Sequence, residues 1–132
     1  MIYLGLAALV ALVVVVWLVW PGQGLGVTWS GAPGGPLRFR IRLNSVIPRL
    51  LGSDGTSLFG VAHIRGKTVS AYLLAHEVGH CLRARGNSVG YLFRYLTSSA
   101  FRAAEEEWCH AFGLTHRLDP FLASLAQRLE AK

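Results

Sequence analysis

The sequence is poor in acidic side chains, in cysteine and, over residues 2–20, in charge of either sign. Its 7 Asp and Glu residues stand against 13 Lys and Arg residues, which gives a formal net charge of +6. Such a balance is typical of proteins that meet nucleic acid, anionic lipid or acidic partners. Because the basic residues are scattered and form no stripe interleaved with aromatic side chains, we expect no nucleic-acid partner.

The two cysteines, Cys81 and Cys109, are too few for a disulfide framework. Their spacing also fits no zinc ribbon or CxxC redox motif. We interpret them as two buried thiols, with one disulfide between their helices as the alternative. At 132 residues, the chain has room for one domain after its apolar segment.

Residues 2–20 form an apolar run about as long as a helix needs to cross a ~30 Å hydrocarbon core. Trp17 and Trp20 stand near its end, where indole rings favour the headgroup boundary, and Pro21 ends the helix. The segment lacks the basic start and the cleavage site of a secretory signal. We therefore predict a retained, single-pass membrane anchor at residues 1–20, which contacts the lipid bilayer through residues 2–20.

Residues 21–36 are rich in Gly and Pro and predict a linker, so the globular domain is expected at residues 37–132. Residues 37–43 (LRFRIRL) alternate apolar and basic side chains, which predicts a half-buried strand. No Lys or Arg precedes the apolar run, whereas several arginines follow it, and the positive-inside rule then favours a cytoplasmic domain.

The remaining chain predicts mainly helices. Residues 58–65 are expected to form a strand, whose edge could pair with an extended substrate or simply complete a small sheet. Helical periodicity follows over residues 69–85 and 98–112, with a short helix or connector at 90–96 and a final helix capped by Asp119. The fold class expected is α+β, with an N-terminal transmembrane helix followed by a small, mainly helical domain and a short β-sheet.

The motif HEVGH spans His76 to His80 inside one of these helices. Residues four apart lie on one helix face, so both imidazoles can bind one zinc ion, with Glu77 beside the water that the metal activates. Leu74 and Val78 fall on the opposite side of the helical wheel. The helix therefore has one face for the core and another for a metal.

A third ligand is expected, because catalytic zinc usually has three protein ligands and one open position. The metzincin continuation of the motif is excluded, because Arg83 and Gly86 stand where that class has Gly and His. A later helix offers Glu105, Glu106 and Glu107. Glu105 lies near the apolar face of that helix, where an unpaired carboxylate is costly, and the other two point away. We select Glu105, with His110 and His116 as the alternatives.

The HEVGH motif, followed 25 residues after His80 by a Glu-rich helix, resembles the gluzincin metallopeptidases. The HtpX-like membrane-anchored peptidases and the ImmA-type peptidases are particularly similar. The resemblance covers residues 58–113 and implies a zincin-like domain, a Zn²⁺ cofactor, and Glu105 as the third ligand. The sequence departs from the family at Trp108, where a small residue is usual, and at Cys109, where Asp or Asn would orient a zinc-binding histidine.

These observations predict a membrane-anchored zinc metallopeptidase that acts on a protein or peptide substrate. His76, His80 and Glu105 would hold the metal, and Glu77 would serve as general base and then proton donor. Candidates for stabilising the oxyanion are Tyr91, Tyr95 and His110. Two alternatives remain open: a catalytically degenerate, membrane-tethered metal-binding or interaction module, and an anchored structural protein in which HEVGH is accidental.

Overall fold

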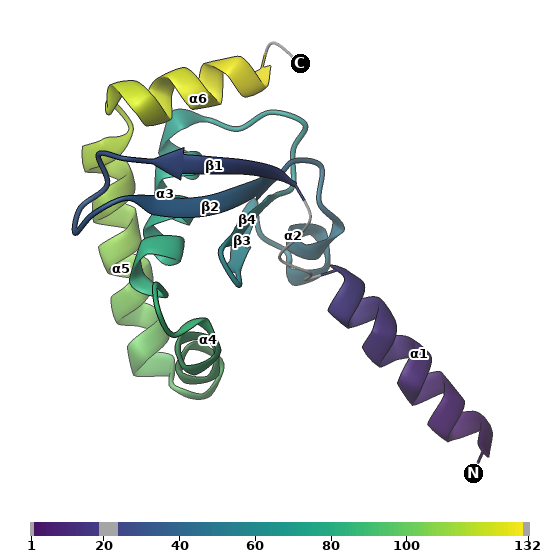
Figure 1. Ribbon diagram of the computed structural model, residues 1–132. Helices are drawn as coiled ribbons and strands as arrows, with labels where there is room; N and C mark the ends of the chain where they lie inside the picture. The colour runs from purple at the N-terminus through teal and green to yellow at the C-terminus, as the bar shows by residue number, and fades with distance from the viewer. Residues whose placement is uncertain (1, 19–23, 131–132) are drawn as a thin grey trace.

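The computed structural model describes residues 2–18 and 24–130, and Figure 1 shows its helices and strands. The helices are α1 (Ile2–Leu18), α2 (Val46–Leu51), α3 (Ala71–Arg83), α4 (Ser88–Thr97), α5 (Ser99–His116) and α6 (Pro120–Glu130). The strands are β1 (Leu25–Trp29), β2 (Leu37–Arg42), β3 (Gly55–Leu58) and β4 (Val61–Ile64). The α+β class predicted from the sequence is confirmed: an N-terminal helix precedes a small mixed sheet and several helices.

The four strands form one sheet in the order β1-β2-β4-β3. Strands β2 and β4 are parallel, whereas β1 and β3 pair antiparallel with their neighbours. Strand β1 lies inside residues 21–36, for which the sequence predicts a linker. Its last residue, Trp29, is only 2% exposed and packs against Phe112 and Phe121. Burial of this aromatic side chain stabilises β1. The Gly and Pro residues around β1 make the strand hard to recognise from the sequence.

Residues 58–65, predicted as one strand, contain the last residue of β3 and all of β4. A turn at Phe59 and Gly60, both with positive φ (51° and 75°), separates β3 from β4. Gly60 adopts this conformation without the strain that a side chain brings. The turn places β4 inside the sheet and leaves β3 at its edge.

The core lies between the sheet and α3. Leu37, Phe39 and Ile41 of β2 alternate with arginines and are buried, as the period-two pattern predicts. Leu74 and Val78, the predicted core face of α3, are fully buried in the same cluster. This packing fixes which side of α3 faces away from the sheet.

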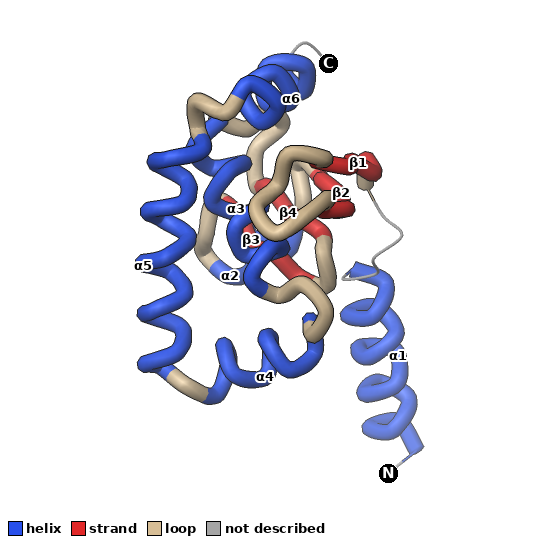
Figure 2. Tube along the Cα trace, turned by 60° about the vertical axis from the view of Figure 1, so that its left-hand side comes forward, coloured by secondary structure: helices blue, strands red, loops and turns tan. Residues whose placement is uncertain are grey.

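Helix α3 lies between the sheet and α5, which runs along one side of the molecule, with α4 at one end and α6 at the other (Figure 2). Small residues let α3 and α5 approach closely. A Cβ at Gly79 would lie 3.2 Å from the Phe112 ring, and one at Gly113 would lie 2.9 Å from the Tyr72 ring. Gly113 thus serves packing, and α5 continues through it to His116 instead of ending at Phe112 as predicted.

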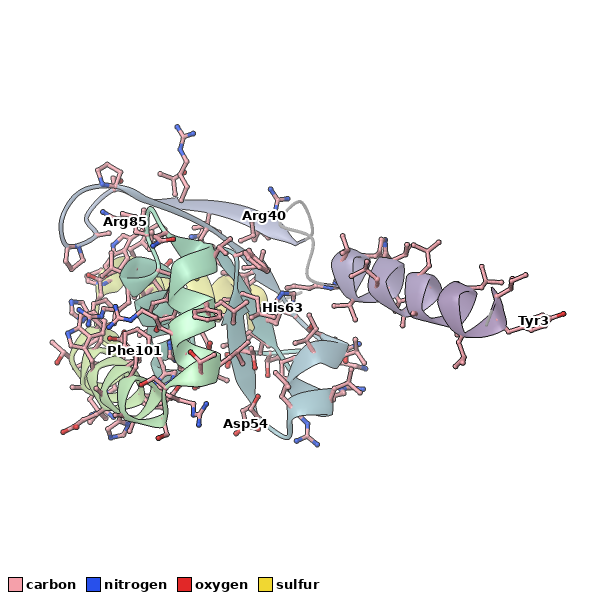
Figure 3. All side chains as sticks on the ribbon, turned by 90° about the horizontal axis from the view of Figure 1, so that it is seen from below. Tyr3, Arg40, Asp54, His63, Arg85 and Phe101 are labelled. Atoms are coloured by element: carbon pink, nitrogen blue, oxygen red, sulfur yellow. The ribbon has the colours of Figure 1, made fainter. Side chains whose placement is uncertain are left out.

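Helix α1 extends away from the sheet and the other helices, with Tyr3 near its far end (Figure 3). Over residues 2–18 and 24–130, none of the helices combines the length and the apolar character that crossing a membrane requires. The predicted anchor also includes residues 1, 19 and 20, which lie outside the described residues.

Candidate metal centre

His76, His80 and Glu106 converge on one point between α3 and α5. Nε2 of His76 lies 3.3 Å from Glu106 Oε2, and Nε2 of His80 lies 3.0 Å from Glu106 Oε1. One ligand atom from each residue lies within 4.8 Å of the other two, so the three side chains can hold a metal ion. We call these residues the metal cluster.

Glu105, the third ligand expected from the helical wheel, lies outside this cluster. Its carboxylate accepts two hydrogen bonds from Arg83, at 2.9 Å from Nε and 2.6 Å from Nη2. Glu105 is only 3% exposed, as the helical wheel predicts, and a buried carboxylate needs a partner. The partner is a guanidinium, and the adjacent Glu106 faces the two histidines.

Arg83 is the signal in the sequence that could have separated the two carboxylates. It follows His80 by three residues and so lies on a neighbouring part of the same helix surface. An arginine there is a permanent cation with planar donors suited to a carboxylate. The Tyr91 hydroxyl also donates to Glu105, at 3.2 Å. A second polar group therefore consists of Arg83, Glu105 and Tyr91. We call it the Arg83 clamp.

Helix caps set where these side chains project. The Ser70 hydroxyl accepts from Leu73 N at 3.1 Å and begins α3, and the Asn87 amide oxygen accepts from Gly90 N at 3.0 Å and begins α4. Helix α4 carries Tyr91 and Tyr95 to the cluster. The Tyr91 hydroxyl lies 3.0 Å from His80 Nδ1, and the Tyr95 hydroxyl donates to Glu106.

Glu77 is held beside the cluster by edge strand β3. The Ser57 hydroxyl lies 2.8 Å from both the carboxylate Oε2 and the carbonyl oxygen of Glu77. A Cβ at Gly55 would lie 2.7 Å from Glu77 Oε1, so glycine allows the strand to approach this closely. Sequence reasoning missed both β3 residues, because their contacts arise from the fold. Burial raises the pKa of Glu77, although His80 and Ser57 oppose this effect.

The two remaining histidines proposed as alternative ligands lie outside the metal cluster. His110 pairs with the Tyr72 hydroxyl. His116 stacks on Phe112, with its Nδ1 3.1 Å from the carbonyl oxygen of that residue. Both thiols, Cys81 and Cys109, are free and buried, as the preferred interpretation of the sequence stated.

The two carboxylates differ in the charges that surround them. Hydrogen bonds from Arg83 hold the pKa of Glu105 below its usual range. Hydrogen bonds from His76 and His80 lower the pKa of Glu106 further. Burial opposes the charged form of His76, but its hydrogen bond with Glu106 and its proximity to Glu77 outweigh burial and raise its pKa. The metal cluster thus attracts positive charge.

The donor set suits zinc, which binds imidazole nitrogen and carboxylate oxygen at about 2.0–2.2 Å. Tetrahedral coordination at those lengths separates neighbouring ligand atoms by roughly 3.3 Å. The two N–O distances in the metal cluster, 3.3 and 3.0 Å, run to different oxygens of Glu106. One ligand atom from each of the three residues lies within 4.8 Å of the other two, so a bound zinc ion would draw these atoms closer together.

A cleft of about 550 Å³ opens over the cluster. His76, Glu77, His80 and Glu106 line it together with strand β3 and the inner side of α4. Its remaining walls include apolar side chains of α2, β3, the following turn and α4: Leu51, Leu58, Phe59, Leu92 and Leu96. A substrate in the cleft would contact the metal cluster, Glu77 and the edge strand β3 together.

The structure retains one part of the gluzincin resemblance, the HxxxH spacing with a glutamate opposite it. Comparison with protein-family models, with curated proteins and with solved structures gives no match. The chain is thus an α+β protein with a group of two histidines and one glutamate that can hold a metal ion.

Proposed function

We propose that this chain is a zinc metallopeptidase in which His76, His80 and Glu106 bind the metal and Glu77 is the general base. The observation that carries the proposal is the convergence of the metal cluster and a buried glutamate at one cleft. Two histidines and one glutamate form a ligand set found at catalytic zinc, and a second glutamate nearby is the residue type that serves as general base there.

Glu77 performs the proton transfers. A bound zinc ion supplies Lewis acidity, which lowers the pKa of water and polarises a carbonyl group. The Glu77 carboxylate accepts the proton of the attacking water and returns it to the nitrogen of the departing amine. Burial raises the pKa of Glu77, which makes this carboxylate a better proton acceptor than an exposed one. Ser57 fixes the orientation of the carboxylate through its hydrogen bond.

We propose an extended peptide with apolar side chains as the substrate. Strand β3 is an edge strand and lines the cleft, so its outer edge can pair with the main chain of an added strand. Leucine and phenylalanine side chains on the walls would then receive alternate side chains of the peptide.

We further propose that α1 attaches the domain to a lipid bilayer, with the domain on the cytoplasmic side. The side chains of α1 are apolar and largely exposed, as at Leu4 (74%) and Leu12 (59%), and an apolar surface of this extent favours lipid over water. Its 17 residues extend about 25 Å, and the predicted anchor adds residues 19 and 20. Flotation of the full chain with lipid vesicles tests the attachment, and protease accessibility in cells tests the orientation.

Hydrolysis of internally quenched peptides with apolar residues around the cleaved bond tests the activity of the full chain in detergent. We expect zinc-dependent cleavage that a chelator removes and added zinc restores. Glu77→Gln should lower the rate by about 10²–10⁴-fold while zinc stays bound. Glu107→Gln is the matched control, because Glu107 is exposed on α5 and does not line the cleft.

Unchanged cleavage in Glu77→Gln would contradict the proposed mechanism. Stoichiometric zinc without cleavage of any peptide in the set would instead favour a metal-binding module without turnover. If wild type binds no zinc, the HEVGH motif is accidental.

A further inference from the structure

An unbroken series of hydrogen bonds joins the Arg83 clamp to the metal cluster. Arg83 donates twice to Glu105, the Tyr91 hydroxyl donates to Glu105 at 3.2 Å, and the same hydroxyl lies 3.0 Å from His80 Nδ1. The opposite ring nitrogen of His80, Nε2, is the atom that faces Glu106. The series therefore ends on a proposed metal ligand.

The direction of each hydrogen bond follows from the groups involved. An ionised carboxylate only accepts, so the single hydroxyl proton of Tyr91 goes to Glu105. The oxygen of Tyr91 is then left as an acceptor, and Nδ1 of His80 must donate to it. A neutral imidazole that carries its proton on Nδ1 has a lone pair on Nε2. Without a metal ion, a proton on Nε2 can be donated to Glu106. In the neutral tautomer the Nε2 lone pair faces that carboxylate, so a cation between the two atoms would take the place of the proton.

We propose that the Arg83 clamp is a positioning network that holds His80 in the tautomer and orientation needed to bind the metal. This inference rests on the proposed zinc site. Outer partners of this kind typically change metal affinity by 10–100-fold when removed. Glu105 is thus a positioning residue that acts on the metal through Tyr91 and His80.

Two aromatic side chains pack against the Arg83 clamp. The Arg83 guanidinium lies 4.8 Å from the centre of the Trp108 ring, which gives the arginine a cation–π contact besides its two bonds to Glu105. Trp108 stands where the gluzincin motif has a small residue, and this contact accounts for the large side chain. Tyr91 also packs edge-to-face on Phe101. Nδ1 of His76, by contrast, is buried and has no hydrogen-bond partner among the described residues.

Replacing Tyr91 by phenylalanine tests the inference, because it removes one hydroxyl and keeps the ring. We expect Tyr91→Phe to weaken zinc binding by about 10–100-fold in chelator competition and to change the visible spectrum of the Co²⁺-loaded full chain. Tyr72→Phe is the matched control. The Tyr72 hydroxyl also lines the cleft but pairs with His110, so zinc affinity and the Co²⁺ spectrum should stay as in wild type.

The unfolding free energy of the zinc-free protein separates positioning from simple support of the fold. Should Tyr91→Phe lower that free energy while zinc affinity and the Co²⁺ spectrum stay unchanged, the inference is overturned and the zinc site still stands. If Tyr91→Phe does not fold, Glu105→Asp replaces it, because the shorter carboxylate withdraws from Tyr91 and should produce the same two changes. Zinc binding without peptide cleavage would overturn the proposed function alone, and no zinc in wild type would overturn both.

Discussion

The metal cluster is built from α3 and α5, and the Arg83 clamp is built from the same two helices together with α4. Their carboxylates are neighbours in the chain. Glu105 faces a permanent cation, and its side chain is 4% exposed. Glu106 faces two imidazoles, which are cationic only when protonated, and its side chain is 42% exposed at the cleft. The clamp therefore balances its own charge, whereas the cluster lacks a permanent positive charge that a metal ion would supply. Charge balance and burial both distinguish Glu105 from Glu106, the proposed metal ligand.

We expect the largest effect on zinc binding from His80→Ala, which removes one residue of the metal cluster. Loss of one of three ligands should weaken zinc binding by more than about 100-fold, beyond the range typical of outer partners. His110→Ala is the control, since His110 pairs with Tyr72 outside the cluster. Isothermal titration with zinc in a competing chelator measures both, and equal losses in the two variants would contradict the assignment.

His63 offers a third case beside the metal cluster and the Arg83 clamp, since it is a buried polar side chain that stays uncharged. It is fully buried on β4, with Nδ1 3.0 Å from the Ser45 hydroxyl, and burial with the nearby Arg42 guanidinium lowers its pKa from 6.5 to about 4. Because the unfolded chain takes up this proton more readily, stability is complete above pH 6.5 and falls as the pH drops towards 4. Between pH 7 and 4.5 the loss from this residue should be about 2–3 kcal/mol.

Urea unfolding of the zinc-free protein at both pH values, in wild type and in His63→Gln, measures that contribution. The neutral glutamine should remove this part of the acid sensitivity. An identical pH dependence in the two proteins would show that His63 does not titrate as its burial requires.

Arg83→Met removes the cation from the clamp and leaves Glu105 without its main partner. Breaking a fully buried ion pair costs about 3–5 kcal/mol, but Arg83 is 42% exposed and Tyr91 still donates to Glu105, so we expect about 2 kcal/mol. The additional change Glu105→Met should restore most of this loss. Thermal unfolding of both variants, with Arg128→Met on α6 as the surface control, gives the values. A double variant as unstable as the single one would contradict the charge argument.

Gly113→Ala is expected to have the smallest effect. The added Cβ would lie 2.9 Å from the Tyr72 ring and 3.3 Å from His76 Cβ, so α3 and α5 must shift near the metal cluster. We expect a loss of about 1–2 kcal/mol in stability and a weakening of zinc binding by roughly tenfold or less. Gly5→Ala in α1 is the matched control, because it adds the same Cβ to a helix at a position where nothing lies within 4 Å. An equal loss of zinc affinity in the two variants would contradict this explanation.

Sequence reasoning reached the parts of the site that depend on local periodicity. The wheel of α3 correctly separated His76 and His80 from the core face, and Asp119 caps α6 through Phe121 N at 3.0 Å. These features depend on residues within a few positions of one another. Local patterns therefore predicted the helix that carries the motif.

The parts that sequence reasoning missed depend on contacts between distant segments. Which of two adjacent glutamates meets the histidines depends on how α5 crosses α3. Arg83 pairs with Glu105, 22 residues later in the chain, and Glu106 is left to face the histidines. The placement of Ser57 against Glu77 requires β3 at the sheet edge. Strand β1 forms because Trp29 packs against Phe112 and Phe121, which lie much later in the chain.

Zinc affinity of three matched variants, Glu105→Gln, Glu106→Gln and Glu107→Gln, tests the central claim most directly. In the full chain, Glu106→Gln should weaken binding by more than about 100-fold, because a negatively charged ligand is lost. Glu105→Gln should weaken it by about tenfold through Tyr91 and His80, and Glu107→Gln should match wild type. A greater loss in Glu105→Gln than in Glu106→Gln would contradict the assignment of Glu106 as the third ligand.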